Sequence, residues 1–232
     1  MSGRLPIRRL IIAIDGPSGA GKSTVAKRVA EALGYPYIDT GAMYRAVALA
    51  VIEKGIEAGD DLEMTRLSES VEMEFQLTDR GQRLLLNGRD VTEAIRTPEV
   101  TRLSSPVSAI PGVRRSLVAK QQRMGAGGGV VMEGRDIGSV VFPNADVKVF
   151  LTASPLERAR RRWNQLTRDG YQVTVEQILK DQAERDERDS TRPDSPLRQM
   201  PDALFIDSDR LSVDGVVKLI LDRCAELASL SR

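Results

Sequence analysis

The stretch AIDGPSGAGKST, residues 13–24, decides the fold class. It follows Leu10–Ile14, an apolar run of strand length, and leads into the helical apolar spacing of Ser23–Leu33. Residues 16–23 fit the spacing G-x-x-x-x-G-K-[ST] between a strand and a helix. Glycines let such a loop curl its backbone N–H groups around phosphate oxygens, and the helix adds its positive N-terminus. The pattern predicts a bound nucleoside triphosphate.

The residues of this loop have separate predicted tasks. Lys22 is expected to reach the β- and γ-phosphates, and the Ser23 hydroxyl is expected to bind Mg²⁺. The loop does not define the reaction, because switches, motors and small-molecule kinases all use it. The predicted triphosphate site consists of Gly16, Pro17, Ser18, Gly19, Ala20, Gly21, Lys22, Ser23 and Thr24.

Composition excludes several kinds of chemistry. The 232 residues contain no histidine and one cysteine, so histidine-based triads and His- or Cys-ligated zinc sites are excluded. The net charge of +1 and the aromatic content of 4% argue against a nucleic-acid partner. No apolar run approaches the roughly 20 residues that span a bilayer. We expect a cytoplasmic protein without a membrane partner, whose Cys224 packs in the core.

Strand-like and helix-like segments alternate, which predicts an α/β fold with a parallel sheet covered by helices on both faces. Ser154 and Pro155 predict one helix start, and a capping box of Thr174 and Gln177 predicts another. The five expected strands are Leu10–Ile14, Pro36–Ile38, Gly129–Met132, Val147–Leu151 and Ala203–Ile206, and further helices are expected at Ala42–Lys54 and Val213–Leu230.

Residues 66–108 break this alternation. Val71, Met73, Phe75 and Leu77 alternate with polar residues, which predicts a strand with one solvated face. Turn signals follow at residues 79–81 and 87–88. We expect a small antiparallel β insert at 66–108 within a core domain formed by 1–65 and 109–232.

Polar residues cluster where two further strands end, which is where open α/β sheets bind ligands. The second strand leads to Thr40 and Arg45, and the third to Glu133, Arg135 and Asp136. An acid after a buried strand is typical of a Mg²⁺ site. Alternatively, the Gly-Arg-Asp segment is a surface turn with one ion pair.

Arginines recur in two later segments. ERARRRWNQL, residues 157–166, holds four, and Arg185, Arg188 and Arg192 fall on one helical face. Spacing alone favours equally a solvated helix, with Glu184 paired to Arg188, and a phosphate clamp.

Together, the segments IDGPSGAGKST, DTGAMYR, RTPEV…SSPVSAIPGVR, GRDIGSVVFPNADVKVFLTAS and ERDERDSTR resemble the bacterial cytidylate kinases, which are short-chain (d)CMP kinases of the nucleoside monophosphate kinase family. The resemblance runs from about Leu10 to about Ala228. It implies a P-loop kinase that transfers the γ-phosphoryl group of ATP to CMP or dCMP, and a helical lid at about residues 156–170.

The resemblance also implies roles for individual residues. Arg45, Arg135 and Arg192 would bind the acceptor phosphate, with Thr40 near it. Ser105, Arg114 and Asp136 would read the cytosine edge, and Arg185 and Asp189 would lie at the sugar. Arg158 and Arg162 would belong to the lid, and Glu133 to Mg²⁺, although some relatives have Asp there. The implied catalytic group is Lys22, Arg135, Arg158, Arg162 and Arg192.

Three alternatives stay open at this point. The acceptor could be UMP, AMP or a shikimate-like alcohol. The chain could be a regulatory nucleotide switch whose insert binds a protein, or, least favoured by the charge distribution, a nucleic-acid-binding protein. We expect small-molecule partners only, and a monomer.

Overall fold

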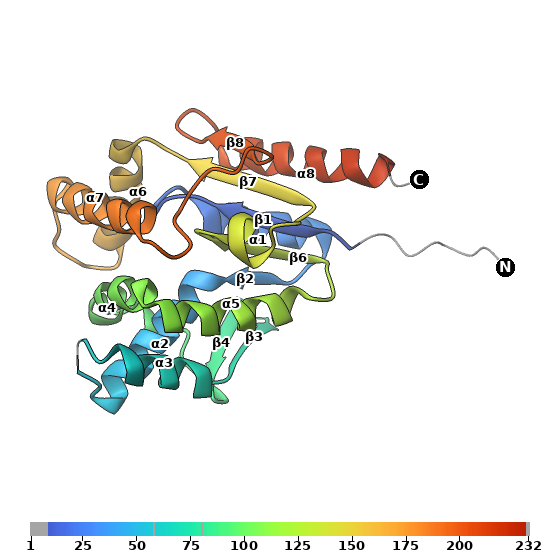
Figure 1. Cartoon of the computed structure of the whole chain (residues 1–232). Coiled ribbons are helices and arrows are strands. Elements are labelled where there is room, and N and C mark those ends of the chain that lie inside the picture. Colours follow the sequence, from blue (N-terminus) through green and yellow to red (C-terminus); the bar gives the residue numbers. More distant parts are fainter. Residues whose placement is uncertain (1–8, 58, 80, 231–232) are drawn as a thin grey trace. The chain divides into compact units, whose positions relative to one another are not determined.

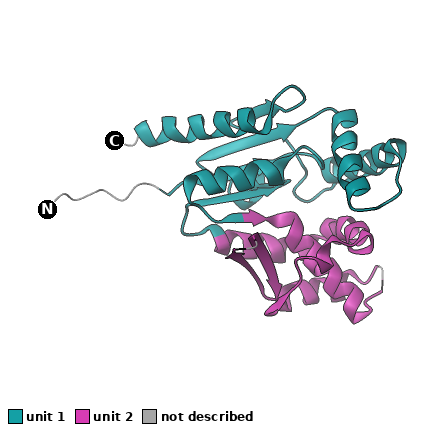
Figure 2. Cartoon of the chain, turned by 180° about the vertical axis from the view of Figure 1, so that it is seen from behind, with its two compact units in different colours: residues 1–37, 125–232 teal, residues 38–124 magenta. Residues whose placement is uncertain are grey.

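The computed structural model describes residues 9–57, 59–79 and 81–230 (Figure 1). The chain divides into two compact units (Figure 2). Residues 1–37 and 125–232 form one, here called the sheet unit, and residues 38–124 form the other, here called the middle unit.

The main sheet has the strand order β2-β6-β1-β7-β8. The central strand β1 pairs in parallel with β6 and β7, and β7 pairs in parallel with β8. Parallel neighbours require crossover connections, which the intervening helices supply. The predicted five-stranded parallel sheet is confirmed. Its strands are β1 (Ile11–Asp15), β2 (Tyr37–Asp39), β6 (Val130–Gly134), β7 (Val147–Thr152) and β8 (Leu204–Asp207).

Two helices of the sheet unit share a core with the sheet. Val25 and Val29 of α1 and Val216 and Ile220 of α8 are buried in one cluster with residues of β1 and β7. Cys224 belongs to the same cluster, as predicted. The helical elements of this unit are α1 (Lys22–Leu33), η2 (Ile137–Val141, a π-helical turn), α6 (Pro155–Arg168), α7 (Val175–Thr191) and α8 (Val213–Leu230).

The helix starts follow the predicted capping chemistry. The Ser154 hydroxyl accepts the Glu157 N–H at 3.3 Å, with Pro155 in the first turn. The Thr174 hydroxyl accepts the Gln177 N–H at 3.2 Å, and the Gln177 side chain accepts the Thr174 N–H at 3.0 Å. Both predictions are confirmed.

The middle unit is built around α2, which is buried along most of its length. Met43, Val47 and Val51 of this helix are almost fully buried. The elements of this unit are α2 (Thr40–Lys54), α3 (Asp61–Ser70), β3 (Met73–Thr78), β4 (Gly81–Leu86), β5 (Arg89–Asp90), η1 (Ala94–Arg96), α4 (Pro98–Ala109) and α5 (Pro111–Gly125).

The insert predicted at 66–108 is only partly a meander. Strands β3, β4 and β5 form an antiparallel sheet, with Asn87 and Gly88 at positive φ in the turn between β4 and β5. The strands cover only part of the predicted range. α4 is helical because Thr97 caps it and Pro98 occupies its first turn. Arg80, in the other predicted turn, lies outside the described residues. The division into a core, an insert at 66–108 and a lid stays a prediction.

Candidate active site

The loop between β1 and α1 has the backbone of a phosphate-binding turn. Gly16, Gly19 and Gly21 have φ of +151°, +79° and +92°, values that favour glycine. A Cβ on Gly16 would overlap the carbonyl oxygen of Leu151 in β7. The loop therefore lies directly against the neighbouring strand, and a side chain at Gly16 has no room.

Lys22 begins α1 and closes the loop. Its side chain is buried, and its Nζ donates to the carbonyl oxygen of Pro17 at 2.8 Å. Burial, reinforced by the charge of Arg135, lowers its pKa to about 7. Ser23 and Thr24 follow, exposed on the first turn of the helix. The loop thus places one lysine and the N–H groups of a helix start where an anion can bind.

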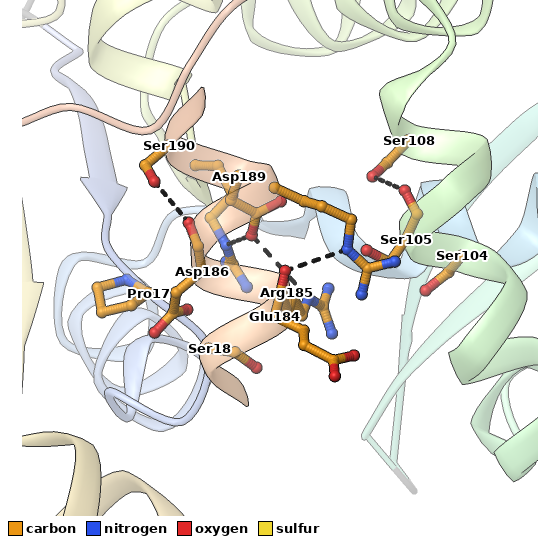
Figure 3. Close-up of polar contacts among 12 residues, drawn as sticks. Pro17, Ser18, Ser104, Ser105, Ser108, Glu184, Arg185, Asp186, Asp189 and Ser190 are labelled. Carbon is orange, nitrogen blue, oxygen red and sulfur yellow. Dashed lines mark hydrogen bonds and ion pairs between the residues drawn. The ribbon is translucent and has the colours of Figure 1, made fainter. Parts of the chain in front are cut away.

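A cluster of arginines surrounds one carboxylate in the sheet unit. Arg135 Nε donates to Asp189 Oδ2 at 2.9 Å, and Arg192 Nη1 lies 3.6 Å from Asp189 Oδ1. Arg185, one turn before Asp189 on α7, has its Nε 3.9 Å from Asp189 Oδ2 (Figure 3). Burial raises the pKa of Asp189, but the three guanidinium groups outweigh it and hold the pKa below its usual value.

This cluster separates the arginines of the row by their surroundings. Arg185 and Arg192 pair with the buried Asp189, whereas Arg188 is exposed and donates to the backbone oxygen of Glu184 at 3.2 Å. Arg135 comes from the end of β6, so residues far apart in sequence meet here. Arg135 and Arg185 also lower the pKa of Lys22, so the charges of the cluster act on the lysine of the phosphate loop.

The turn after β6 holds Asp136 and is fixed by a residue that sequence analysis did not select. Asp15, the last residue of β1, accepts the N–H groups of Ile137 at 2.8 Å and Gly138 at 2.7 Å. Burial raises the pKa of Asp15 to about 6. Asp136 is itself buried, with Oδ1 3.9 Å from Arg192 Nη2. The Gly-Arg-Asp segment is therefore not an exposed surface turn.

Glu133 precedes this turn on β6 and is buried. Its Oε1 accepts the Tyr37 hydroxyl at 2.7 Å. In the described part of the chain, no group of three or more Asp, Glu, His or Cys side chains is placed to hold a metal ion. Hydroxyl and carboxylate oxygens nevertheless suit Mg²⁺, which usually takes only one or two protein ligands beside phosphates and water. Ser23 and Glu133 are thus chemically suitable ligands.

The arginines of α6 differ in their surroundings. Arg158 is buried and donates to the backbone oxygen of Ser18 at 3.0 Å and to Asp186 Oδ2 at 2.6 Å. Arg161 donates to Ser208 Oγ at 3.0 Å and to its backbone oxygen at 3.0 Å. Arg162 donates to Gln165 Oε1 at 2.9 Å, one turn along the same helix. Helix α6 is thereby tied to the phosphate loop through Arg158.

Four of the predicted acceptor residues lie in the middle unit. Asp39 caps α2 by accepting the Ala42 N–H at 2.9 Å, and it also accepts from Arg45 Nη2 at 3.0 Å. Thr40 is buried at the start of that helix. Burial raises the pKa of Asp39, but the charge of Arg45 and the hydrogen bonds from Ala42 and Arg45 together outweigh burial and lower the pKa.

Ser105 and Arg114 belong to α4 and α5. Ser105 is buried, and its Oγ has no hydrogen-bond partner among the residues that the structure describes. Its backbone oxygen accepts the Ser108 hydroxyl at 2.8 Å (Figure 3). Arg114 is almost fully buried; its Nη1 donates to Ser108 O at 3.1 Å, and its guanidinium lies 5.6 Å from the centre of the Tyr44 ring.

Sequence analysis missed Asp15, Asp39, Asp186 and Arg161 as site neighbours. Only Asp39 carried a local signal, because an Asp before a helical run is a common N-cap. The others contact partners far away in sequence. Their roles depend on which strand ends and helices meet, and spacing does not reveal this.

Strand, glycine loop, lysine and helix define a phosphate-binding P-loop protein of the α/β class. A sequence model described as "Cytidylate kinase" matches residues 12–226. The cytidylate kinase of Solibacter usitatus (strain Ellin6076) is 51% identical over 216 residues, which cover 92% of this chain and 91% of that protein. The cytidylate kinase of Bacillus subtilis (strain 168) is 47% identical, over 93% of this chain and 96% of that protein. The chain belongs to the cytidylate kinase family.

One solved structure resembles this chain in its fold, at a low sequence identity. An uncharacterized protein from Eubacterium ventriosum ATCC 27560 matches with a TM-score of 0.50 and 14% identity, covering 92% of this chain and 97% of that one. Within the described residues, no helix combines the length and the apolar character needed to cross a membrane.

Proposed function

We propose that this protein transfers the γ-phosphoryl group of ATP to CMP or dCMP, giving CDP or dCDP and ADP, in pyrimidine nucleotide metabolism. Family membership supports the reaction. The observation that carries the chemistry is the gathering of Arg135, Arg185 and Arg192 around Asp189, next to Lys22 of the phosphate loop. A P-loop switch needs one anion site, whereas a kinase needs a second one for the acceptor.

The mechanism we infer is electrostatic. Phosphoryl transfer proceeds through a loose transition state with negative charge on the equatorial oxygens, so positioning and cations dominate the catalysis. Lys22 neutralises the β- and γ-phosphates, while Arg135 and Arg192 hold the acceptor phosphate in line. Asp189 keeps these guanidinium groups together before substrate binds. No histidine or other general base is required.

Magnesium fits this assignment, with Ser23 as one ligand and Glu133 as a second. When bound, the ion would neutralise charge on the β- and γ-phosphates. The hydrogen bond from Tyr37 to Glu133 Oε1 orients that carboxylate. Glu133 is longer than the Asp that some relatives have at this position, and Tyr37 restrains its side chain.

In this proposal, the base, the phosphate and the sugar of the acceptor are bound by different residues. Asp136 accepts from the cytosine N4 amine, and Arg114 donates to ring N3 or O2. The Ser105 hydroxyl, buried and without a partner in the described chain, is suited to the same base edge. Thr40 and Arg45 serve the acceptor phosphate, and Arg185 and Asp189 the sugar.

We further propose a lid of residues 156–170 that carries Arg158 and Arg162. Its closure would exclude water and suppress ATP hydrolysis. The hydrogen bonds of Arg158 to Ser18 and Asp186, and those of Arg161 to Ser208, tie the start of α6, so the moving part begins beyond Arg161. We also propose a cytoplasmic location, which the single cysteine supports, and a monomer; cell fractionation and sedimentation equilibrium would test these two assignments.

An acceptor panel with ATP and Mg²⁺ tests the proposed reaction. CMP and dCMP are expected to give higher kcat/KM values than UMP, AMP or shikimate, with ADP formed in step with the acceptor product. A higher value for UMP or AMP would overturn the cytosine assignment. ATP hydrolysis without acceptor at the rate seen with CMP would favour a regulatory switch.

A further inference from the structure

The carboxylate of Asp15 makes two hydrogen bonds to a loop that belongs to another strand. Asp15 ends β1, directly before the phosphate loop, and is paired with Gly134 of β6. Its Oδ1 accepts the Ile137 N–H at 2.8 Å, and its Oδ2 accepts the Gly138 N–H at 2.7 Å. Both oxygens thus bind the turn that follows Arg135 and Asp136.

These two N–H groups need an acceptor because of the shape of the turn. η2 begins after Asp136, whose backbone oxygen accepts from Val140 at 2.9 Å and Val141 at 3.2 Å. As at any helix start, the first N–H groups have no partner within the turn. Asp15 therefore acts as an N-cap supplied from the neighbouring strand.

This arrangement changes what Asp136 can do. Asp136 occupies the N-cap position of η2, where an Asp side chain ordinarily accepts from the turn. Here its side chain makes no capping hydrogen bond. Its Oδ1 instead lies 3.9 Å from Arg192 Nη2. Because Asp15 caps the turn, the Asp136 side chain is not used for capping and its Oδ1 lies near Arg192 instead.

Burying the Asp15 carboxylate in this cap has an electrostatic cost. Burial raises the pKa of Asp15 to about 6 although two N–H groups and Lys22 favour its charged form, and the neighbouring charge of Asp136 adds to that penalty. Gly138 has little spare room, since a Cβ there would lie 3.3 Å from Asp15 Oδ2 and 3.2 Å from Lys148. Asp136 could cap the turn without a second buried carboxylate, so stability alone does not account for Asp15.

We propose that Asp15 is a positioning residue for the acceptor: by capping η2 it holds the turn that presents Arg135 and Asp136. This inference rests on the proposed function, in which those two side chains bind the acceptor phosphate and the base. Asp15 itself contacts neither substrate. Its removal should therefore loosen acceptor binding more than ATP binding, although Asp15 is next to Gly16 in the chain.

The test is steady-state kinetics of Asp15→Asn. An amide keeps the shape but retains a single acceptor oxygen, so one N–H of the turn loses its partner. We expect the KM for CMP to rise about 10-fold and the KM for ATP to change less than about 2-fold. An ATP effect as large as the CMP effect would show that Asp15 supports the phosphate loop instead, and would overturn the proposal.

Asp146→Asn is the matched control. Asp146 Oδ2 accepts the Ile11 N–H at 2.8 Å, so it caps the other end of β1. Asparagine can keep this single hydrogen bond through its amide oxygen, so the variant removes a carboxylate charge near the other end of the same strand without leaving an N–H of η2 unpaired. We expect both KM values to stay near wild type. An equal rise in the CMP KM for both variants would reduce Asp15 to a general support of the strand and overturn the proposal.

Hydrogen exchange gives a readout that is independent of turnover. In Asp15→Asn, the amides of Ile137 and Gly138 should exchange faster, while those of β1 stay protected. Unchanged exchange at both amides would also overturn the proposal. Failure of the proposed function would appear differently, as a wild-type protein that forms no ADP in the presence of CMP.

Discussion

At the scale of single residues, Asp136 carries the choice of acceptor in the proposed reaction. A carboxylate accepts from the N4 amine of cytosine, whereas uracil presents a carbonyl oxygen there and would be repelled. For Asp136→Ala we expect the ratio of kcat/KM for CMP to that for UMP to fall about 10- to 100-fold. Asp181→Ala, a change at an exposed position of α7, should leave the ratio unchanged. An unchanged ratio in Asp136→Ala would contradict the assignment.

Lys22 is the second residue with a sharply defined task. Its buried ammonium faces a loop built for phosphates, and no other lysine belongs to that loop. Lys22→Ala should lower kcat about 10²- to 10³-fold, because charge in the transition state loses its closest cation. Lys27→Ala removes an exposed lysine of the same helix and should retain wild-type kcat. A loss of similar size in both variants would point to damage to α1 rather than to the loss of one charge.

At the scale of elements, the phosphate loop depends on its contact with β7. A Cβ at Gly16 would meet the Leu151 backbone oxygen, which cannot move without distorting the sheet. Gly16→Ala should lower the free energy of unfolding by more than about 2 kcal/mol. Gly34→Ala is the control, since Gly34 also has positive φ, +65°, but lies in open space. Its expected cost is about 1 kcal/mol. Urea unfolding of the two variants compares them, and equal losses would contradict the steric argument.

Elements with local signals could be predicted from the sequence. The starts of α6 and α7 followed from Ser154 and from the pair Thr174 and Gln177, because capping uses residues within one turn. The same chemistry, Thr97 before Pro98, marks the start of α4, but the alternating pattern of β3 drew the predicted meander too far along the chain. The capping signal of Thr97 and Pro98 was thus present in the sequence, but the alternating pattern of β3 outweighed it in the prediction.

The site was predictable only in part for a different reason. Gly16 to Thr24 form a contiguous motif, so their loop could be inferred with its backbone conformation. The hydrogen bonds from Ile137 and Gly138 to Asp15 join residues 122 and 123 positions apart in sequence, and the one from Arg135 to Asp189 joins residues 54 positions apart. Such contacts depend on strand order, which periodicity does not encode.

At the scale of the whole molecule, the sheet unit has an apolar core cluster built from its own residues. In the sheet unit, one apolar cluster joins β1, β7, α1 and α8, so these elements should unfold together. Cys224 of α8 is only 3% exposed within that cluster. Its thiol can therefore report on the opening of this core without any engineered label.

Labelling of the Cys224 thiol at pH 8 tests whether this core is closed. Burial, with the charge of Asp146 as a second cause, raises the pKa of Cys224 to about 11 from 9.0. The native thiol is thus both covered and protonated, and iodoacetamide should react with it at least about 100-fold more slowly than in urea. Labelling as fast in the native protein as in urea would show that α8 does not pack as described.

The same pKa shift predicts how stability depends on pH. Between pH 9.0 and about 11, the native thiol keeps a proton that the unfolded chain releases. The unfolded state binds fewer protons, so the free energy of unfolding falls as pH rises through this window, by up to about 3 kcal/mol from this group. Below pH 9 the contribution is constant. Cys224→Ala removes the titrating group, and its unfolding free energy should decline less steeply between pH 9 and 10.5 than that of the wild type. Parallel profiles for the two proteins would mean that Cys224 titrates alike in both states, and hence that the α8 side of the core admits water.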